Sequence, residues 1–391
     1  VGQDLRRLEI HTEAQGFPKV TLSALVDTAK VSSSLRVAKN ETTVMSTPMM
    51  TITGRAFFDS FLKPLDREAW LAAVTALLRS IHEVDKTATQ IWFAFYPPEL
   101  FHALKASADA EKLARQLLLQ GNYQLKDQID SSHTFLYGHR YWPEVKQAIA
   151  AHATQWRELE SVPVRSATAG WATSLVDQIL EVATTVASQL KVDVSLVAGI
   201  TAVGFMTLQQ VGPETFNREP GKVLLDSKYI RKSPEQVLKA RAKDDSQGWL
   251  GFLKTVDKKW TVTYDENDDH ASYRLNHAQD LAWGAADDRT RNWSEIDPRR
   301  IEGPIPVECR SASCGTCWVG VLGGSEKLSD VAVREGKQIK SFGYIDTPEP
   351  RPLIRLACQA RAQGAVSIVI PPWNGVFGKF LKQQTQDEEL E

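Results

Sequence analysis

The four cysteines constrain this chain more than any other feature of its 391 residues. Three of them, Cys309, Cys314 and Cys317, follow the spacing C-x4-C-x2-C, and Cys358 stands far downstream. Most residues between the first three are small, and Gly315 permits backbone angles that other residues avoid. The loop can therefore turn back sharply around a small bound group. Because the pattern uses every thiol, none is left for a disulfide or a nucleophile.

This spacing is typical of the ligands of a [2Fe–2S] cluster, which takes two thiolates on each iron. A zinc site usually pairs two short C-x2-4-C motifs, whereas Cys358 has no close partner in the sequence. Four buried apolar cysteines are a further alternative. A thioredoxin-like pair at 314–317 is rejected, because the motif does not open a helix after a strand. The sequence predicts a [2Fe–2S] cofactor and one-electron transfer. The predicted ligands are Cys309, Cys314, Cys317 and Cys358.

The residues around the cysteines predict a small mixed domain. Alternating apolar residues on both sides of a polar turn indicate a hairpin, and Asn276 is a candidate cap for the helix that follows. The predicted elements are strands 260–264 and 271–275, a helix over 277–288, and strands over 318–322 and 365–370.

With these elements in place, residues 256–376 resemble the plant-type [2Fe–2S] ferredoxin family. The match falls on the four cysteines, on Ala-Ser-Cys-Gly-Thr-Cys at 312–317 and on Leu-Ala-Cys-Gln at 356–359. The resemblance implies a β-grasp fold and a carrier of low-potential electrons. An extra loop at 292–306 and the large Trp318 after the third cysteine depart from the family, and both could change the docking surface.

The chain is too long for one ferredoxin domain, so more than one domain is expected. The predicted fold class is α+β: a C-terminal β-grasp [2Fe–2S] ferredoxin-like domain preceded by an α-rich α+β domain and a helical middle segment. The expected boundaries are 1–162 for the first domain, of unknown role, 163–255 for a helical hairpin and connector, and 256–391 for the ferredoxin-like domain with its acidic tail.

Within the first domain, apolar periodicity and Pro143 at a helix start predict helices, and an apolar run before Pro97 predicts a buried strand. His133 and His139 lie close to Trp142 and could hold a second metal or haem, although an aromatic loop packed on the domain is the favoured interpretation. The predicted elements are helices 66–84, 98–106, 109–120 and 143–158, and a strand over 91–96.

The middle segment raises the question of a membrane. Residues 171–190 form an amphipathic pattern, and residues 194–208 carry no charge but fall short of the roughly 20 apolar residues of a membrane-spanning helix. A short span, a re-entrant segment and a buried helix are all open, and a buried helical hairpin is favoured. Beyond it, 212–248 is expected to be a connector with one helix over 234–243.

The net charge of −2 argues against nucleic acid as a partner, because phosphate binding demands a basic surface. Acidic residues near the cysteine region could steer basic redox partners or could be solvated turn residues. No secretory signal is expected at the start of the chain, and reduced cysteines holding iron favour the cytoplasm, with the membrane surface as an alternative. The acidic residues concerned are Asp265, Glu266, Asp268, Asp269, Asp287, Asp288, Glu295 and Asp297.

Three functions follow from these features. The leading hypothesis is a ferredoxin-like subunit that passes single electrons between redox proteins within a larger complex. One alternative is a structural or scaffold protein whose cluster mainly stabilises a domain; this alternative includes association with a membrane. The other is an electron-feeding component of an oxidoreductase whose N-terminal domain binds substrate or a second cofactor. No nucleotide-binding glycine loop stands out, so an electron-transfer protein is expected rather than a self-contained catalyst.

Overall fold

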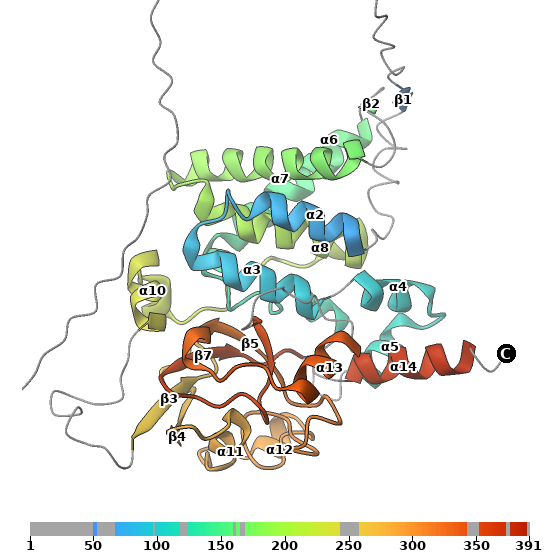
Figure 1. Ribbon diagram of the computed structural model, residues 1–391. Helices are drawn as coiled ribbons and strands as arrows, with labels where there is room; N and C mark the ends of the chain where they lie inside the picture. Colours follow the sequence, from blue (N-terminus) through green and yellow to red (C-terminus); the bar gives the residue numbers. More distant parts are fainter. Residues whose placement is uncertain are drawn as a thin grey trace, which may run out of the picture. The chain divides into compact units, whose positions relative to one another are not determined.

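A computed structural model gives the structure of the chain (Figure 1). By its internal contacts, the chain divides into residues 1–47 and a compact unit from Pro48 to Glu391. The structure describes residues 50–52, 67–96, 98–117, 124–158, 162–164, 169–242, 258–341, 352–372 and 376–388.

The first part of the compact unit is mainly helical. Two short 3-10 turns, Leu125–Gln128 and Tyr137–Tyr141, precede its longest helix. Of the predicted helices, the one over 66–84 ends early, at Leu77, and the other three are confirmed within a few residues. The helices are α2 (Arg67–Leu77), α3 (Glu83–Phe95), α4 (Pro98–Ala106), α5 (Ala110–Leu117) and α6 (Trp142–Glu158).

The strand predicted over 91–96 is wrong, because these residues form the end of α3. All six are buried, so the run shows no helical periodicity, and periodicity alone cannot tell a buried strand from a buried helix. Helix α3 starts at Glu83, where the His82 side chain accepts a hydrogen bond from the backbone N–H of Val84. Tertiary burial on every side therefore hid the helix from a reading of the sequence.

Two long helices follow, α7 (Ala169–Leu190) and α8 (Ser195–Arg218), and they pack against each other. Helix α8 contains all of the uncharged run at 194–208 except Val194, which is its N-cap. It bends at Gly212, where φ is 77°, directly before Pro213. Within the described part of the chain, α8 is the one helix long and apolar enough to cross a membrane, but 78% of its apolar window is buried inside the protein. Buried core helices pass the same test, so this is weak evidence for a membrane span.

The short helices α9 (Ser227–Ile230) and α10 (Pro234–Ala242) lead towards the cysteine region, and α10 confirms the helix predicted over 234–243. Residues 243–257 lie outside the described residues. A two-stranded sheet pairs β1 (Met50–Ile52) with β2 (Val162–Val164).

The cysteine region is built on a five-stranded mixed sheet with the order β4-β3-β7-β5-β6. The predicted hairpin is confirmed as an antiparallel pair, and β3 also pairs with β7 in parallel. The strands are β3 (Lys259–Thr263), β4 (Ser272–Asn276), β5 (Trp318–Gly323), β6 (Ile354–Leu356) and β7 (Val366–Val369).

Four helices accompany this sheet: α11 (Leu281–Ala286), α12 (Trp293–Ile296), α13 (Val333–Ser341) and α14 (Val376–Glu388). The helix predicted from 277 starts later, at Leu281, because Asp280 is the cap and accepts a hydrogen bond from the backbone N–H of Trp283. The predicted acidic tail begins as part of α14, and only its last residues, 389–391, lie outside the described residues.

The helical part and the sheet are in direct contact through α3 and β5. A side chain at Gly320 would collide with Ile91 and Phe95, so glycine is what lets α3 lie this close to the strand. This contact joins segments that the sequence analysis assigned to different domains. The domain boundaries at 162 and 255 stay a prediction.

Candidate functional site: the cysteine loop and its supports

The pairing of β5 with β6 brings distant cysteines together. In this antiparallel pair Trp318 lies opposite Leu356, and the backbone N–H of Ala357 donates to the carbonyl oxygen of Cys317 at 2.9 Å. Cys317 ends the cysteine loop just before β5, and Cys358 follows just after β6. The register of the sheet therefore places the third and fourth cysteines side by side.

The loop that carries the first three cysteines has an unusual backbone. Arg310, Ala312 and Gly315 have φ values of 52°, 60° and 67°, in the left-handed region that residues other than glycine rarely adopt. Such backbone persists only where the surrounding structure enforces it. Its effect is to turn backbone N–H groups towards sulfur atoms: Cys314 N lies 3.3 Å from Cys309 Sγ, and Thr316 N lies 3.4 Å from Cys314 Sγ.

The thiols interact as two pairs. Cys309 and Cys314 form one pair, and Cys317 and Cys358 form the other through a hydrogen bond between the two side chains. That bond raises the pKa of the Cys317 thiol and lowers the pKa of Cys358 to about 7. Electrostatic coupling between Cys314 and Cys317, and between Cys309 and Cys358, shows that all four predicted residues gather at one place.

Hydrogen bonds lower the pKa of the Cys309 thiol. Burial raises the pKa of its thiol, but hydrogen bonds from the Ser313 and Cys314 side chains and from the Ser311 backbone outweigh burial and lower the pKa to about 6. These donors stabilise negative charge on the Cys309 sulfur, which is what binding of a thiolate-ligated metal group requires.

Helix α11 and the loop after it hold the Cys358 side of the site. The backbone N–H groups of Leu281 and Ala282 donate to the carbonyl oxygens of Ala360 and Ala357. The loop at 292–306 packs so closely on α11 that a side chain at Gly303 would meet the carbonyl oxygen of Ala285 at 2.0 Å. The extra loop noted in the sequence is therefore part of the support of the cysteine region.

A buried ion pair supports β6, the strand that leads to Cys358. The guanidinium of Arg355 donates to the two carboxylate oxygens of Glu335 at 2.8 and 3.0 Å, and both side chains have no exposed area. Glu335 also accepts the backbone N–H of Leu356 at 2.8 Å. Sequence reasoning missed this pair. The one signal was a charged residue, Arg355, inside the apolar run at 353–358.

The outer edge of the site is partly open. Cys309 and Cys314 are half-buried, whereas Cys317 and Cys358 are buried. Beside this edge the guanidinium of Arg310 lies 4.0 Å from the ring centre of Trp283 and forms an ion pair with Glu302. Trp283 is 53% exposed, so an aromatic surface stands next to the open side of the cysteines.

The donor set suits a two-iron cluster, which takes two thiolates on each iron. Two thiol pairs in mutual electrostatic contact provide two thiolates for each of two irons. The left-handed loop supplies N–H groups directed at the sulfurs, as such clusters use.

Comparison with known families addresses the same region. Residues 295–363 match the model of the 2Fe-2S iron-sulfur cluster binding domain. The match supports a [2Fe–2S] cofactor and, in general terms, a role in electron transfer. No curated protein and no solved structure matches the chain.

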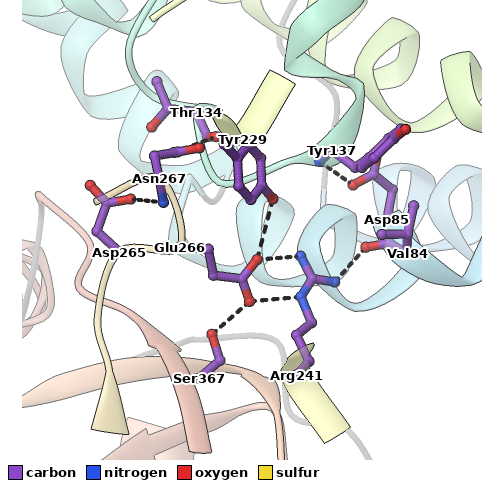
Figure 2. A network of polar contacts seen from close by, with 10 residues as sticks. All are labelled: Val84, Asp85, Thr134, Tyr137, Tyr229, Arg241, Asp265, Glu266, Asn267 and Ser367. Carbon is purple, nitrogen blue, oxygen red and sulfur yellow. Dashed lines mark hydrogen bonds and ion pairs between the residues drawn. The ribbon is translucent and has the colours of Figure 1, made fainter. Parts of the chain in front are cut away.

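Several of the acidic residues near this domain have basic partners. Glu266 accepts two hydrogen bonds from Arg241, at 2.8 and 2.9 Å, and further ones from Ser367 and Tyr229 (Figure 2). Arg241 also donates to the carbonyl oxygen of Val84 in α3, so this buried network ties the hairpin turn to the helical part. Three more of the acids have basic partners, in the pairs Asp268–Arg291, Asp269–Lys228 and Asp297–Arg299.

The two histidines of the helical part are bonded to each other. Nδ1 of His133 lies 2.8 Å from Nδ1 of His139, His133 Nε2 bonds the carbonyl oxygen of Ile129, and the backbone N–H of Leu224 donates to His139 Nε2. All four ring nitrogens are thus engaged within the protein, and none is left to hold a metal. Burial lowers the pKa of His133 to about 4 and that of His139 to about 2.

Proposed function

We propose that Cys309, Cys314, Cys317 and Cys358 are the ligands of the [2Fe–2S] cluster. The observation that carries the proposal is the gathering of these thiols in two pairs at the junction of the cysteine loop, β5 and β6. By this pairing, Cys309 and Cys314 would bind one iron, and Cys317 and Cys358 the other.

The cluster, when bound, takes up and gives back one electron. The protein then has to stabilise the added negative charge. The backbone N–H groups of Cys314 and Thr316 point at sulfur atoms, and donors of this kind favour the reduced form. The half-buried Cys309 and Cys314 would give the electron its shortest path to a partner, across the edge where Trp283 is exposed.

A β-grasp fold for the cysteine region is part of the proposal. It is supported by a hairpin (β3, β4), a helix after it (α11), and a last strand, β7, that runs parallel to β3 in the centre of the sheet. The family match covers the cysteine loop, β5 and the turn after β6.

The chain would act as a ferredoxin-like subunit of a larger redox assembly in the cytoplasm, exchanging electrons with protein partners. The size of the helical part supports this role, because a freely diffusing carrier needs no such body. The packing of α3 on β5 and the buried Arg241–Glu266 pair support it as well, since they anchor the cluster segment to that body.

Low-temperature EPR on dithionite-reduced protein, with iron and zinc measured on the same sample, tests the core of the proposal. We expect the rhombic signal of a reduced cluster and about two irons per chain. Replacing Cys314 or Cys358 with serine should lower the iron content, whereas Ser294→Ala, at an exposed position away from the cysteines, should leave it unchanged. An EPR-silent protein that holds one zinc would contradict the proposal.

A second measurement separates electron transfer from a scaffold role. The reduced cluster should be reoxidised by small redox mediators at a rate that exceeds its loss of iron. If the cluster could not be reduced and reoxidised without breakdown, while Cys314→Ser still disrupted folding, a cluster that only stabilises the domain would explain the protein better.

A further inference from the structure

A cavity of about 350 Å³ lies between the helical part and the sheet of the cysteine region. One wall comes from the end of α3 and from residues 131–135, and the other from the end of β3, α12 and the end of β7. Cavities of this size bind small organic molecules when a few polar groups point into an otherwise apolar lining. This one is separate from the four cysteines, none of which lines it.

The cavity holds a cation that lacks a full counter-charge. Arg300 lines it, and its side chain is only 15% exposed. The nearest carboxylate, Asp297, lies 3.6 Å away but is already engaged by Arg299, whose guanidinium bonds both of its oxygens. Nε of Arg300 has no hydrogen-bond partner among the described residues. One buried carboxylate therefore faces two guanidinium groups. Burial lowers the pKa of Arg300; of its charged neighbours, Asp297 raises that pKa and Arg299 lowers it.

A neutral donor accompanies this cation. Tyr264 lines the same cavity, and its hydroxyl is buried with no hydrogen-bond partner in the part of the chain that the structure describes. Burial raises its pKa to about 12, so the hydroxyl keeps its proton. The negative charge of Asp288, which also has an unpartnered buried carboxylate oxygen, adds to this rise in the Tyr264 pKa. Unpartnered buried donors are costly, and an anion that accepted from both would remove that cost.

The rest of the lining favours a flat apolar body. The ring of Trp293 meets that of Tyr264 edge-on, with their centres 5.7 Å apart, and Phe135 lines the opposite wall. Three acids also line the cavity. Asp268 is paired with Arg291, and Glu266 is paired with Arg241 as Figure 2 shows. Burial raises the pKa of the third, Asp265, and so disfavours its charged form.

We propose that this cavity binds a small organic anion with a flat apolar body, its carboxylate on Arg300 and Tyr264 and its body between Trp293 and Phe135. Such a ligand would touch both the helical part and the sheet. Binding would therefore couple the helical part to the cluster domain, which is a role in addition to electron transfer. The proposal is independent of the cluster's redox role.

Calorimetric titration of the full cluster-loaded chain with naphthoate tests the proposal, with naphthylmethanol as the uncharged probe of the same shape. We expect saturable binding of one naphthoate per chain and at least tenfold weaker binding of naphthylmethanol, since hydrogen bonds to charged groups contribute a factor of this size or more. Arg300→Gln should weaken naphthoate binding at least tenfold and leave naphthylmethanol unchanged. Tyr264→Phe should weaken naphthoate binding several-fold.

Two controls keep the test decisive. Arg334→Gln removes an exposed arginine on α13, outside the cavity, and should leave naphthoate affinity unchanged. Iron content and melting temperature identify a variant that fails to fold. If the Arg300→Gln variant does not fold, the test rests on Tyr264→Phe and on the naphthoate-dependent rise in the melting temperature of the unmodified chain. Absence of saturable naphthoate binding, equal binding of the two probes, or binding that ignores both substitutions would each overturn the proposal.

Discussion

Replacement of Glu335 by glutamine should destabilise the cysteine region strongly, because the carboxylate neutralises a fully buried cation. Neither Glu335 nor Arg355 has exposed side-chain area, and two hydrogen bonds of 2.8 and 3.0 Å join them. Glu335 also accepts a hydrogen bond from the backbone N–H of Leu356, the last residue of β6, two residues before Cys358. Glutamine can keep one oxygen for that N–H, but it carries no charge.

The expected loss of unfolding free energy follows from the buried charge that is left without a partner. Removing one partner of a buried ion pair leaves an uncompensated charge and costs about 3–5 kcal/mol. Arg355→Met should cost a similar amount, because Glu335 is then the unpaired charge. The double replacement Glu335→Leu with Arg355→Met removes both charges and fills the space, which is often nearly neutral. The two sites should therefore show a coupling energy of about 3 kcal/mol or more.

The assay is urea unfolding under anaerobic conditions, followed by far-UV circular dichroism and by visible absorption of the cluster. The two signals need not coincide in a protein with a bound cofactor, so both are required. Each single variant should also lose iron to a chelator faster than the unmodified chain, since β6 leads directly to Cys358. Lys337→Gln, an exposed position on the same helix, should stay within about 0.5 kcal/mol of the unmodified chain.

Two results would refute this reasoning. Single replacements that cost less than about 1 kcal/mol would show that the charges are solvated in solution. A double replacement that cost the sum of both singles would show that the two residues do not act as a pair.

Three further predictions concern other parts of the chain. Arg241→Met should lower the unfolding free energy by about 3–5 kcal/mol, because Glu266 loses its buried partner, and urea unfolding with Lys228→Gln as an exposed control checks it. The histidine pair should make the unfolding free energy fall as the pH drops below about 6.5. Folding lowers the pKa of both His133 and His139, so the unfolded chain binds more protons than the folded one at such a pH. The expected loss of unfolding free energy at pH 5 is about 2 kcal/mol per histidine. Unfolding at pH 7 and pH 5 should show a smaller difference when His133 and His139 are both replaced by glutamine, and an unchanged difference would contradict the assignment. Trp283→Ala should leave iron content and EPR signal intact but slow reduction by a protein partner several-fold in stopped-flow measurements, and an unchanged rate would exclude this edge as the docking side.

Local patterns in the sequence were sufficient for the cofactor and for the elements with clear periodicity. The cysteine spacing predicted the [2Fe–2S] cofactor that the family match supports, the hairpin followed from alternation of apolar residues, and β5 followed from a short apolar run. These signals are local, since spacing, turns and caps depend on neighbours in the chain. The ligand roles of the four cysteines, the domain boundaries and the partners stay predictions.

The tertiary structure decided what depends on contacts between distant residues. Ile91 to Phe95 belong to helix α3 rather than to a strand, and their burial, against β5 among other elements, left no periodicity from which the helix could be predicted. The acidic turn after β3 faces Arg241 and Arg291 rather than solvent alone. Cys317 and Cys358 meet only because β5 and β6 pair in one register. None of these contacts leaves a local pattern, because each joins residues that are far apart in the chain, and only the packed structure brings their charges and apolar surfaces together.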